Sequence, residues 1–144
     1  MTVPARVSLV TLGVADVARA TAFYTALGWE PSSVSSPEVT FLRTAGARLA
    51  LYGTADLAGE AAGPPPGASG GFRGVTLSVN VEDEAAVAAA VTVVEAAGGR
   101  VLRAPGRAEW GGWIAYFADP DGHVWEVAHN PGFPLGEDGL PQLP

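Results

Sequence analysis

The sequence predicts an α+β fold in which two tandem β-α-β-β-β modules form curved mixed sheets around a cavity. Three observations support this fold class. Strand-like and helix-like segments follow one another in the same order in both halves of the chain. Phe41 and Gly46 in the first half correspond to Phe117 and Gly122 in the second half at one constant offset. A stretch rich in Pro and Gly separates the halves. Internal repeats of this kind fix an architecture before any single motif does.

The first module is predicted over residues 1–57. Residues 6–14 are rich in Val, Leu and Thr and predict a strand. A helix follows: Asp16 is suited to its N-cap, apolar residues recur at helical spacing, and Gly28 can end it in the left-handed conformation. Residues 28–34 predict a short strand, and residues 39–53 predict two strands around a turn that contains Gly46.

The second module is predicted over residues 72–129 and repeats this order. Residues 74–81 predict a strand, and the helix that follows has Asp83 as its N-cap and Gly98 at its end. Residues 98–104 predict a short strand, and residues 113–129 predict a strand, a turn and a strand. Residues 58–71 are predicted to form a linker and residues 130–144 an extended tail, so one domain spans residues 5–130 overall.

Composition excludes several classes of function. The 144 residues carry a formal charge of −7, which argues against binding to nucleic acid or to an anionic membrane surface. The chain has no cysteine, which removes disulfides and thiolate chemistry. No apolar run approaches the length of a membrane span, and the first residues lack the layout of a signal peptide. We therefore expect a cytoplasmic protein without membrane contact.

The stretch YFADPDGHVWEVAHN contains the most informative motif in the chain. An aromatic strand enters the sequence Asp-Pro-Asp-Gly, whose Pro and Gly are typical of a tight turn. The next strand has one acid, Glu126, between Trp125 and Val127. A carboxylate among strand-forming apolar residues is costly to bury unless it has a partner. Glu126 is therefore a candidate functional residue.

This stretch, together with LGVADVARATAFYTALGWE near the start, resembles the vicinal oxygen chelate superfamily, the family of glyoxalase I, extradiol dioxygenases and the fosfomycin and bleomycin resistance proteins. The resemblance covers roughly residues 6–129. It implies that metal-dependent members bind one divalent ion at four inward-facing positions. In this chain those positions are Leu9, Ala50, Gly74 and Glu126, of which only Glu126 has a ligand atom. Because a defined site for Zn or a similar ion needs three or more protein ligands, we expect no metal and no other cofactor.

Strand alternation predicts which other side chains share the cavity with Glu126. The predicted ligand-binding set combines small residues, a few hydroxyls and aromatic side chains, a composition typical of a small-molecule site. It consists of Leu9, Thr11, Ala50, Tyr52, Gly74, Thr76, Ser78, Trp110, Trp113, Tyr116 and Glu126.

Several of these residues have a structural interpretation as well. Glu126 is either a structural carboxylate, in a salt bridge to Arg48, Arg103 or Arg107 or partly solvated, or it accepts a hydrogen bond from a ligand, or it acts as a catalytic general base with a raised pKa. Trp110 and Trp113 either pack in the core or at a dimer contact, or form an apolar wall at the pocket mouth. His123 and His129 are expected at the surface or at a dimer contact.

The resemblance implies three alternative functions. The first is a metal-independent protein that binds a small apolar or aromatic organic molecule, like the sequestering resistance proteins. The second is a metal-independent lyase or isomerase with Glu126 as general base, although the chain has no lysine to assist it. The third is a glyoxalase-type metalloenzyme with displaced ligands. Under each of them we expect a homodimer, because exposed apolar side chains need cover.

Overall fold

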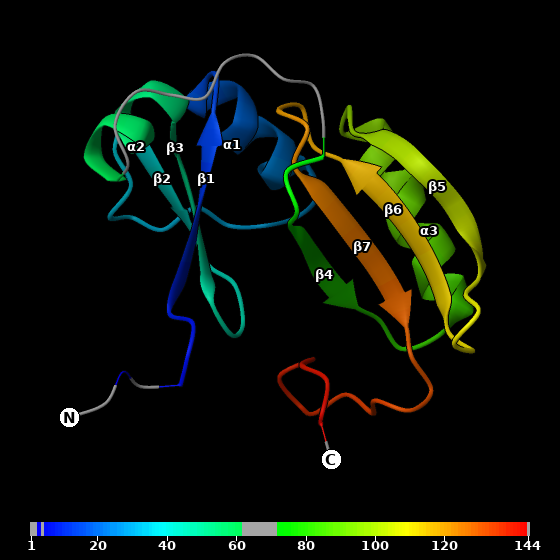
Figure 1. Cartoon of the computed structure of the whole chain (residues 1–144). Coiled ribbons are helices and arrows are strands. Elements are labelled where there is room, and N and C mark those ends of the chain that lie inside the picture. The colour runs from blue at the N-terminus through cyan, green and yellow to red at the C-terminus, as the bar shows by residue number, and fades with distance from the viewer. Residues whose placement is uncertain (1–2, 4, 62–71, 144) are drawn as a thin grey trace.

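The structure is a computed structural model that describes residues 3, 5–61 and 72–143. Seven strands and three helices follow one another along this part of the chain (Figure 1). In chain order the elements are β1 (Leu9–Val14), α1 (Val17–Ala26), β2 (Val39–Leu42), β3 (Arg48–Gly53), α2 (Thr54–Ala61), β4 (Thr76–Asn80), α3 (Glu84–Ala96), β5 (Arg100–Arg107), β6 (Trp113–Ala118) and β7 (Val124–His129).

The strands form two mixed sheets, which confirms the predicted α+β class. One sheet has the order β1-β3-β2 and the other has the order β4-β7-β6-β5. In each module the opening strand pairs in parallel with the closing strand, and the remaining strands are antiparallel. The register pairs Thr11 with Ala50 in the first sheet and Ser78 with Glu126 in the second. The two modules are therefore repeats in strand pairing as well as in sequence.

Both long helices begin and end where the sequence predicts. The carboxylate of Asp16 accepts a hydrogen bond from the backbone N–H of Arg19 at 3.0 Å, and that of Asp83 accepts one from Ala86 at 2.8 Å. These bonds satisfy N–H groups that have no partner within the helix. Gly28 and Gly98 follow the helix ends with φ angles of 93° and 92°, a conformation that favours glycine.

Two elements differ from the sequence prediction. In the first module, residues 28–34 contribute only an isolated bridge between Pro31 and Leu42, because the hydrogen bond from the Ser35 N–H to the Ser32 carbonyl turns the chain directly after it. The second difference is the helix α2, which covers the last residues of the predicted first module, 54–57, and the first residues of the predicted linker, 58–61. Its Leu57 lies over Gly13 of β1. Residues 62–71 of the predicted linker lie outside the described residues.

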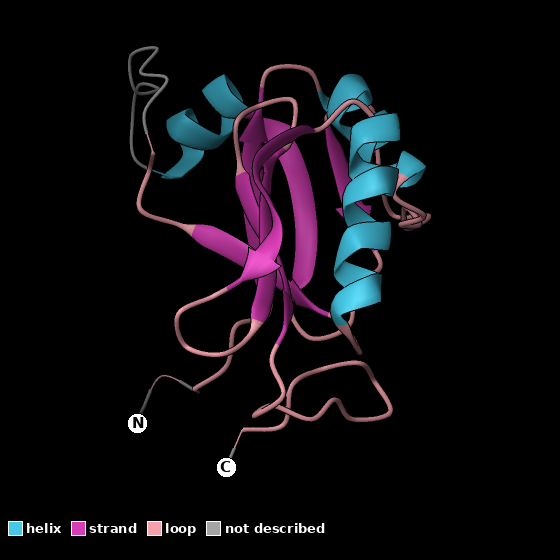
Figure 2. Cartoon of the chain, turned by 90° about the vertical axis from the view of Figure 1, so that its right-hand side faces the viewer, coloured by secondary structure: helices cyan, strands magenta, loops and turns pink. Residues whose placement is uncertain are grey.

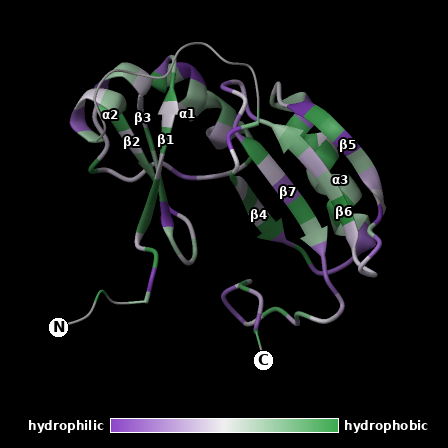
Figure 3. Ribbon diagram, viewed as in Figure 1, coloured by the Kyte–Doolittle hydropathy of each residue, from purple (hydrophilic) through white to green (hydrophobic). Residues whose placement is uncertain are grey.

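One hydrophobic core spans both modules. Helices α1 and α3 lie on the same side of the sheets, whereas α2 lies on the other side (Figure 2). Phe23 and Tyr24 of α1 belong to the same buried cluster as Val87 and Val94 of α3 and Trp125 of β7. The strands β4, β6 and β7 are coloured mainly as hydrophobic (Figure 3). Among the helices of residues 3, 5–61 and 72–143, none is both long enough and apolar enough to cross a membrane.

The turn at residues 119–122 fastens the second module to α1. The buried hydroxyl of Tyr24 donates to Asp119 Oδ2 at 2.6 Å and accepts from Trp125 Nε1 at 3.1 Å. Asp121 Oδ1 accepts from the N–H of Ala15 at 2.8 Å and forms an ion pair with Arg19 at 3.0 Å. The acids of this turn therefore hold the modules together, in addition to shaping the turn itself.

His123 belongs to the same junction. Its Nε2 lies 2.7 Å from the carbonyl oxygen of Gly13 in β1. This contact places a half-buried His123 at the junction of the modules, whereas the sequence suggested the surface or a dimer contact. His129 is half-buried at the end of β7, with its Nδ1 3.3 Å from the carbonyl oxygen of Val81.

Candidate functional site

Glu126 has hydroxyl partners in the structure. Ser78, Glu126 and Tyr116 lie side by side on β4, β7 and β6, on the sheet face opposite α3. The Glu126 carboxylate accepts hydrogen bonds from Ser78 Oγ at 2.9 Å and from the Tyr116 hydroxyl at 2.7 Å. Among the described residues the ion pairs comprise only Arg19–Asp121, so none of the three candidate arginines forms a salt bridge with Glu126. We call Ser78, Tyr116 and Glu126 the carboxylate cluster.

The carboxylate cluster changes the acidity of Tyr116. The hydrogen bond to Glu126 is the largest cause that raises the pKa of Tyr116, followed by partial burial and the negative charge of Glu126. Arg103, which pairs with Tyr116 across β5 and β6, acts in the opposite direction. The phenol therefore remains a hydrogen-bond donor at neutral pH, and the carboxylate has two fixed donors.

The first sheet presents part of the predicted set on its face opposite the core. Leu12 and Val14 of β1 are buried in the core, so Leu9 and Thr11 alternate to the other face. By the same alternation Ala50 and Tyr52 of β3 lie on that face, while Leu49 and Leu51 lie in the core. Leu9 remains 44% exposed, whereas Ala50 is 1% exposed, so this face is open to solvent at Leu9 and covered at Ala50.

The structure places three predicted residues elsewhere. Gly74 is exposed and precedes β4, where its φ of 79° fits a turn. The register shows that Thr76 is the residue of β4 that corresponds to Leu9, since Ser78 corresponds to Thr11. Trp113 packs against the main core because its parity on β6 is opposite to that of Tyr116. The third residue, Trp110, lies outside the sheet.

Trp110 lies in the loop between β5 and β6 and is 55% exposed. Its ring covers Gly112, where an added Cβ would overlap the indole. Gly112 therefore permits the close approach of the Trp110 ring. The nearest atoms to that added Cβ belong to Trp110 and to the backbone of His129.

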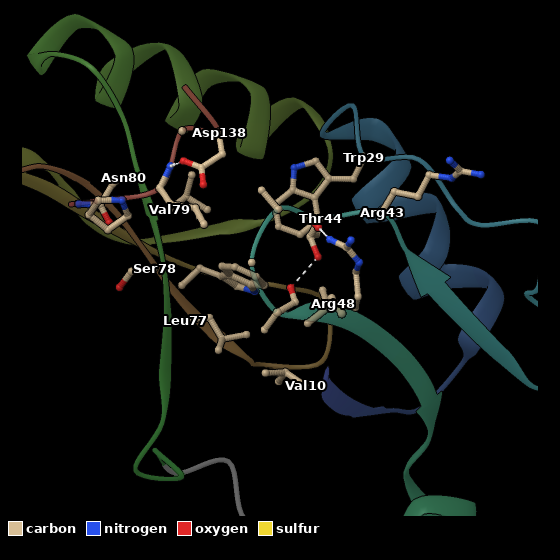
Figure 4. Close-up of a pocket in the computed structure, with 18 residues that line it drawn as sticks. Val10, Trp29, Arg43, Thr44, Arg48, Leu77, Ser78, Val79, Asn80 and Asp138 are labelled. Carbon is tan, nitrogen blue, oxygen red and sulfur yellow. Dashed lines mark hydrogen bonds between the residues drawn. The ribbon is translucent and has the colours of Figure 1, made fainter. Parts of the chain in front are cut away.

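A cavity of about 490 Å³ lies between the two modules (Figure 4). Its walls come from the unpaired edges of β1 and β4, from β3 and β7, from the β2–β3 turn and from the C-terminal tail. The residues that line it are Val10, Trp29, Arg43, Thr44, Ala45, Gly46, Ala47, Arg48, Leu49, Leu77, Ser78, Val79, Asn80, Trp125, Asp138, Gly139, Leu140 and Pro141.

This cavity has a fixed aromatic wall. The rings of Trp29 and Trp125 meet edge to face, with centroids 5.4 Å apart and an interplanar angle of 78°. Tyr24 stacks on Trp29 at 5.5 Å and binds the indole N–H of Trp125. Phe117 stacks on the other side of Trp125 at 6.2 Å. Because each ring is held by neighbours, the wall is formed before any ligand arrives.

The tail closes one side of the cavity. Leu140 lies beside Gly46 of the β2–β3 turn, 3.6 Å from the place of an added Cβ. The tail is folded back on itself by a bridge between Leu135 and Pro141 and by a hydrogen bond from Gly136 N–H to the Leu140 carbonyl at 2.9 Å. The predicted extended tail thus forms a loop that contributes to the cavity.

Of the residues predicted to contact a ligand, Ser78 is the one that lines this cavity. The predicted ligand-binding set did not include Leu77 and Val79, which pack against the core on the face where the cavity opens. It also gave no role to Trp29. One signal was present: both β1 and β4 are opening strands that pair on one side only, so a gap between them is expected.

Comparison with known proteins identifies the family of this fold. The model of the glyoxalase/bleomycin resistance protein/dioxygenase superfamily matches residues 6–127. The chain belongs to this superfamily. A glyoxalase-related enzyme from Fulvimarina pelagi has 33% identity and a TM-score of 0.86, with coverage of 97% of this chain and 99% of that one. A search of curated proteins finds no match.

More distant members of the superfamily share the fold. A family enzyme from Burkholderia phytofirmans is 23% identical with a TM-score of 0.74, covering 87% of this chain and 98% of that one. A lactoylglutathione lyase from Agrobacterium tumefaciens is 24% identical with a TM-score of 0.67, covering 88% and 95%. At this level of identity the likeness is one of fold alone.

Metal-dependent members of the superfamily bind their ion at four positions, and in this chain those positions lack a full set of ligands. The corrected set of positions is Leu9, Ala50, Thr76 and Glu126, which offers one carboxylate and one neutral hydroxyl. Over residues 3, 5–61 and 72–143, no group of three or more His, Cys, Asp and Glu side chains is placed to hold an ion. These residues do not fit a divalent metal, which needs three or more protein ligands.

Proposed function

We propose that this protein binds a small apolar or aromatic organic molecule in the cavity between its two modules. The observation that carries the proposal is the cavity itself. Its volume of about 490 Å³ lies within the range of small-molecule sites, and Trp29, Trp125 and Leu77 give it apolar walls. Arg48 and Asn80 add a few polar groups at its margin, as such sites require for orientation.

The test uses 2-naphthamide, a flat neutral probe, and follows its binding by quenching of tryptophan fluorescence. We expect saturable binding to the wild-type protein. Val10→Phe places extra volume in the cavity and should weaken binding about tenfold or more, the scale of overpacking a formed site. Val93→Phe is the matched control, because Val93 is exposed on α3 and outside the cavity. Equal loss in both variants, or no binding to wild type, would contradict the proposal.

A second candidate function is a metal-independent lyase or isomerase with Glu126 as general base. The hydrogen bond that the Tyr116 hydroxyl donates to the Glu126 carboxylate at 2.7 Å favours it, because it holds the carboxylate in one orientation beside a proton donor. Turnover of α-keto hemithioacetals or epoxides that is lost in Glu126→Gln would support this candidate. Absence of turnover with the whole panel, together with binding of 2-naphthamide, would leave the binding function.

We also propose that the protein acts as a cytoplasmic homodimer. Large apolar side chains are exposed and need cover, as Leu9, Val75 and Leu102 illustrate. A second copy of the chain would bury them in an isologous contact. Light scattering at micromolar concentration should give the dimer mass, and a monomer mass would contradict this part of the proposal.

A further inference from the structure

We propose that the cavity selects an aromatic anion, with its carboxylate held by Arg48 and its ring against the wall of Trp29 and Trp125. This inference rests on the proposed binding function and specifies the ligand class. Two observations support it. One is the charge at one side of the cavity, and the other is the unused hydrogen-bonding capacity of Arg48.

The charge near the cavity is opposite to that of the whole chain. The protein has 15 acidic and 8 basic residues, yet two arginines, Arg43 and Arg48, line this one cavity. Neither is in an ion pair, since Arg19–Asp121 is the ion pair of the described residues. The acid that lines the cavity is Asp138, whose Oδ1 accepts from the Leu140 N–H at 3.0 Å. Two arginines that line one cavity without an ion-pair partner, in an acidic protein, favour an anionic ligand.

Arg48 is held in place while most of its donors stay free. Its Nη1 donates to the carbonyl of Thr44 across the β2–β3 turn, and this is the side-chain hydrogen bond of Arg48 among the described residues. A guanidinium has five N–H groups, and its planar fork matches the two oxygens of a carboxylate. Arg48 lies beside Thr44 at the cavity, whereas the guanidinium of Arg43 extends away from it (Figure 4). Arg48 is therefore assigned the direct contact.

The aromatic wall that lines the same cavity as Arg48 indicates that the ligand has an aromatic part. Trp29 is held against Trp125, and Leu77 and Val79 continue the apolar surface along β4. Aromatic rings bury large apolar area and pack well against indole edges and faces. A ligand with a flat ring system at one end and a carboxylate at the other places both parts against matching groups.

The experiment compares two probes of the same shape, 2-naphthoate and 2-naphthamide, by titration calorimetry. On wild-type protein the anion should bind about three- to tenfold more tightly than the amide, the scale of a partly exposed pair with charge-assisted hydrogen bonds. In Arg48→Gln this ratio should fall to about one. Arg100→Gln makes the same charge change at an exposed residue outside the cavity and should keep the wild-type ratio.

The outcomes separate this inference from the proposed function. Equal affinity of wild type for the two probes would overturn the inference and leave the binding function standing. A preference for the anion that Arg48→Gln retains, or that Arg100→Gln loses equally, would also overturn it, because the charge would then act from elsewhere. Failure of both probes to bind wild-type protein would overturn the binding function and the inference together.

Discussion

Replacing Tyr24 with phenylalanine removes one buried hydroxyl that joins the two modules. Tyr24 is 0% exposed, and its hydroxyl lies between Asp119 Oδ2 at 2.6 Å and Trp125 Nε1 at 3.1 Å. Burial, followed by the charge of Asp119, raises the pKa of Tyr24 far above its usual value. The phenol is therefore a neutral donor throughout the ordinary pH range, and the effect of its removal should not depend on pH there.

The size of the effect follows from what the variant leaves behind. Loss of the bond to the Asp119 carboxylate costs about 1.5–3 kcal/mol, the range for a hydrogen bond to a charged group. The indole N–H of Trp125 also loses its acceptor, at a cost of about 1–3 kcal/mol for a buried donor. Partial relaxation lowers the sum, so we expect Tyr24→Phe to reduce the free energy of unfolding by about 3 kcal/mol. For a chain of this size that corresponds to a fall in Tm of roughly 6–12 °C.

Urea unfolding at pH 7, followed by tryptophan fluorescence and by circular dichroism, measures this change. Tyr52→Phe is the matched control: Tyr52 is half-buried on the first sheet, and we expect a change within about 0.5 kcal/mol. If Tyr24→Phe lowers the free energy of unfolding by less than about 1 kcal/mol, or if both variants lower it equally, the claim that this hydroxyl joins the modules is refuted.

Three further predictions concern the carboxylate cluster and the tail. Glu126→Gln weakens two partly exposed charge-assisted hydrogen bonds and should lower the free energy of unfolding by about 1 kcal/mol in urea; greater stability than wild type would contradict the paired carboxylate. The pKa of Tyr116 is raised in the folded state, so the folded protein holds this proton to a higher pH than the unfolded chain does. In thermal melts above about pH 10, wild type should therefore lose stability more steeply with pH than Tyr116→Phe. Parallel curves for the two proteins would refute this. Ending the chain after Glu137 removes one cavity wall and should weaken 2-naphthamide binding about threefold or more by tryptophan fluorescence, and unchanged affinity would show that the tail does not contribute.

Much of the fold was predictable because it depends on local periodicity. Alternation along β4, β6 and β7 places Ser78, Tyr116 and Glu126 on one face, and the strand register brings them into contact. The same rule accounts for one error: Trp113 and Tyr116 stand three residues apart on β6, so one strand cannot present both on one face. The helix caps at Asp16 and Asp83 were predictable from the chemistry of a single side chain.

The cavity was not predictable in the same way. It depends on how the edges of β1 and β4 are placed relative to each other, and on a tail that folds back over the β2–β3 turn. No periodicity in the sequence encodes either placement. The turn at residues 119–122 shows the same limit, because its Pro and Gly predict a turn, whereas the contacts of Asp119 and Asp121 with α1 arise only in the assembled fold.

The central claim, that a small aromatic molecule binds between the modules, is tested most directly by locating a bound probe. Intermolecular nuclear Overhauser effects between the ring protons of 2-naphthamide and assigned side chains give that location in solution. We expect contacts to Trp29, Leu77 and Leu140, which line the cavity. Contacts confined to Tyr116 and Thr76 on the opposite sheet face, or none at saturating probe, would contradict it.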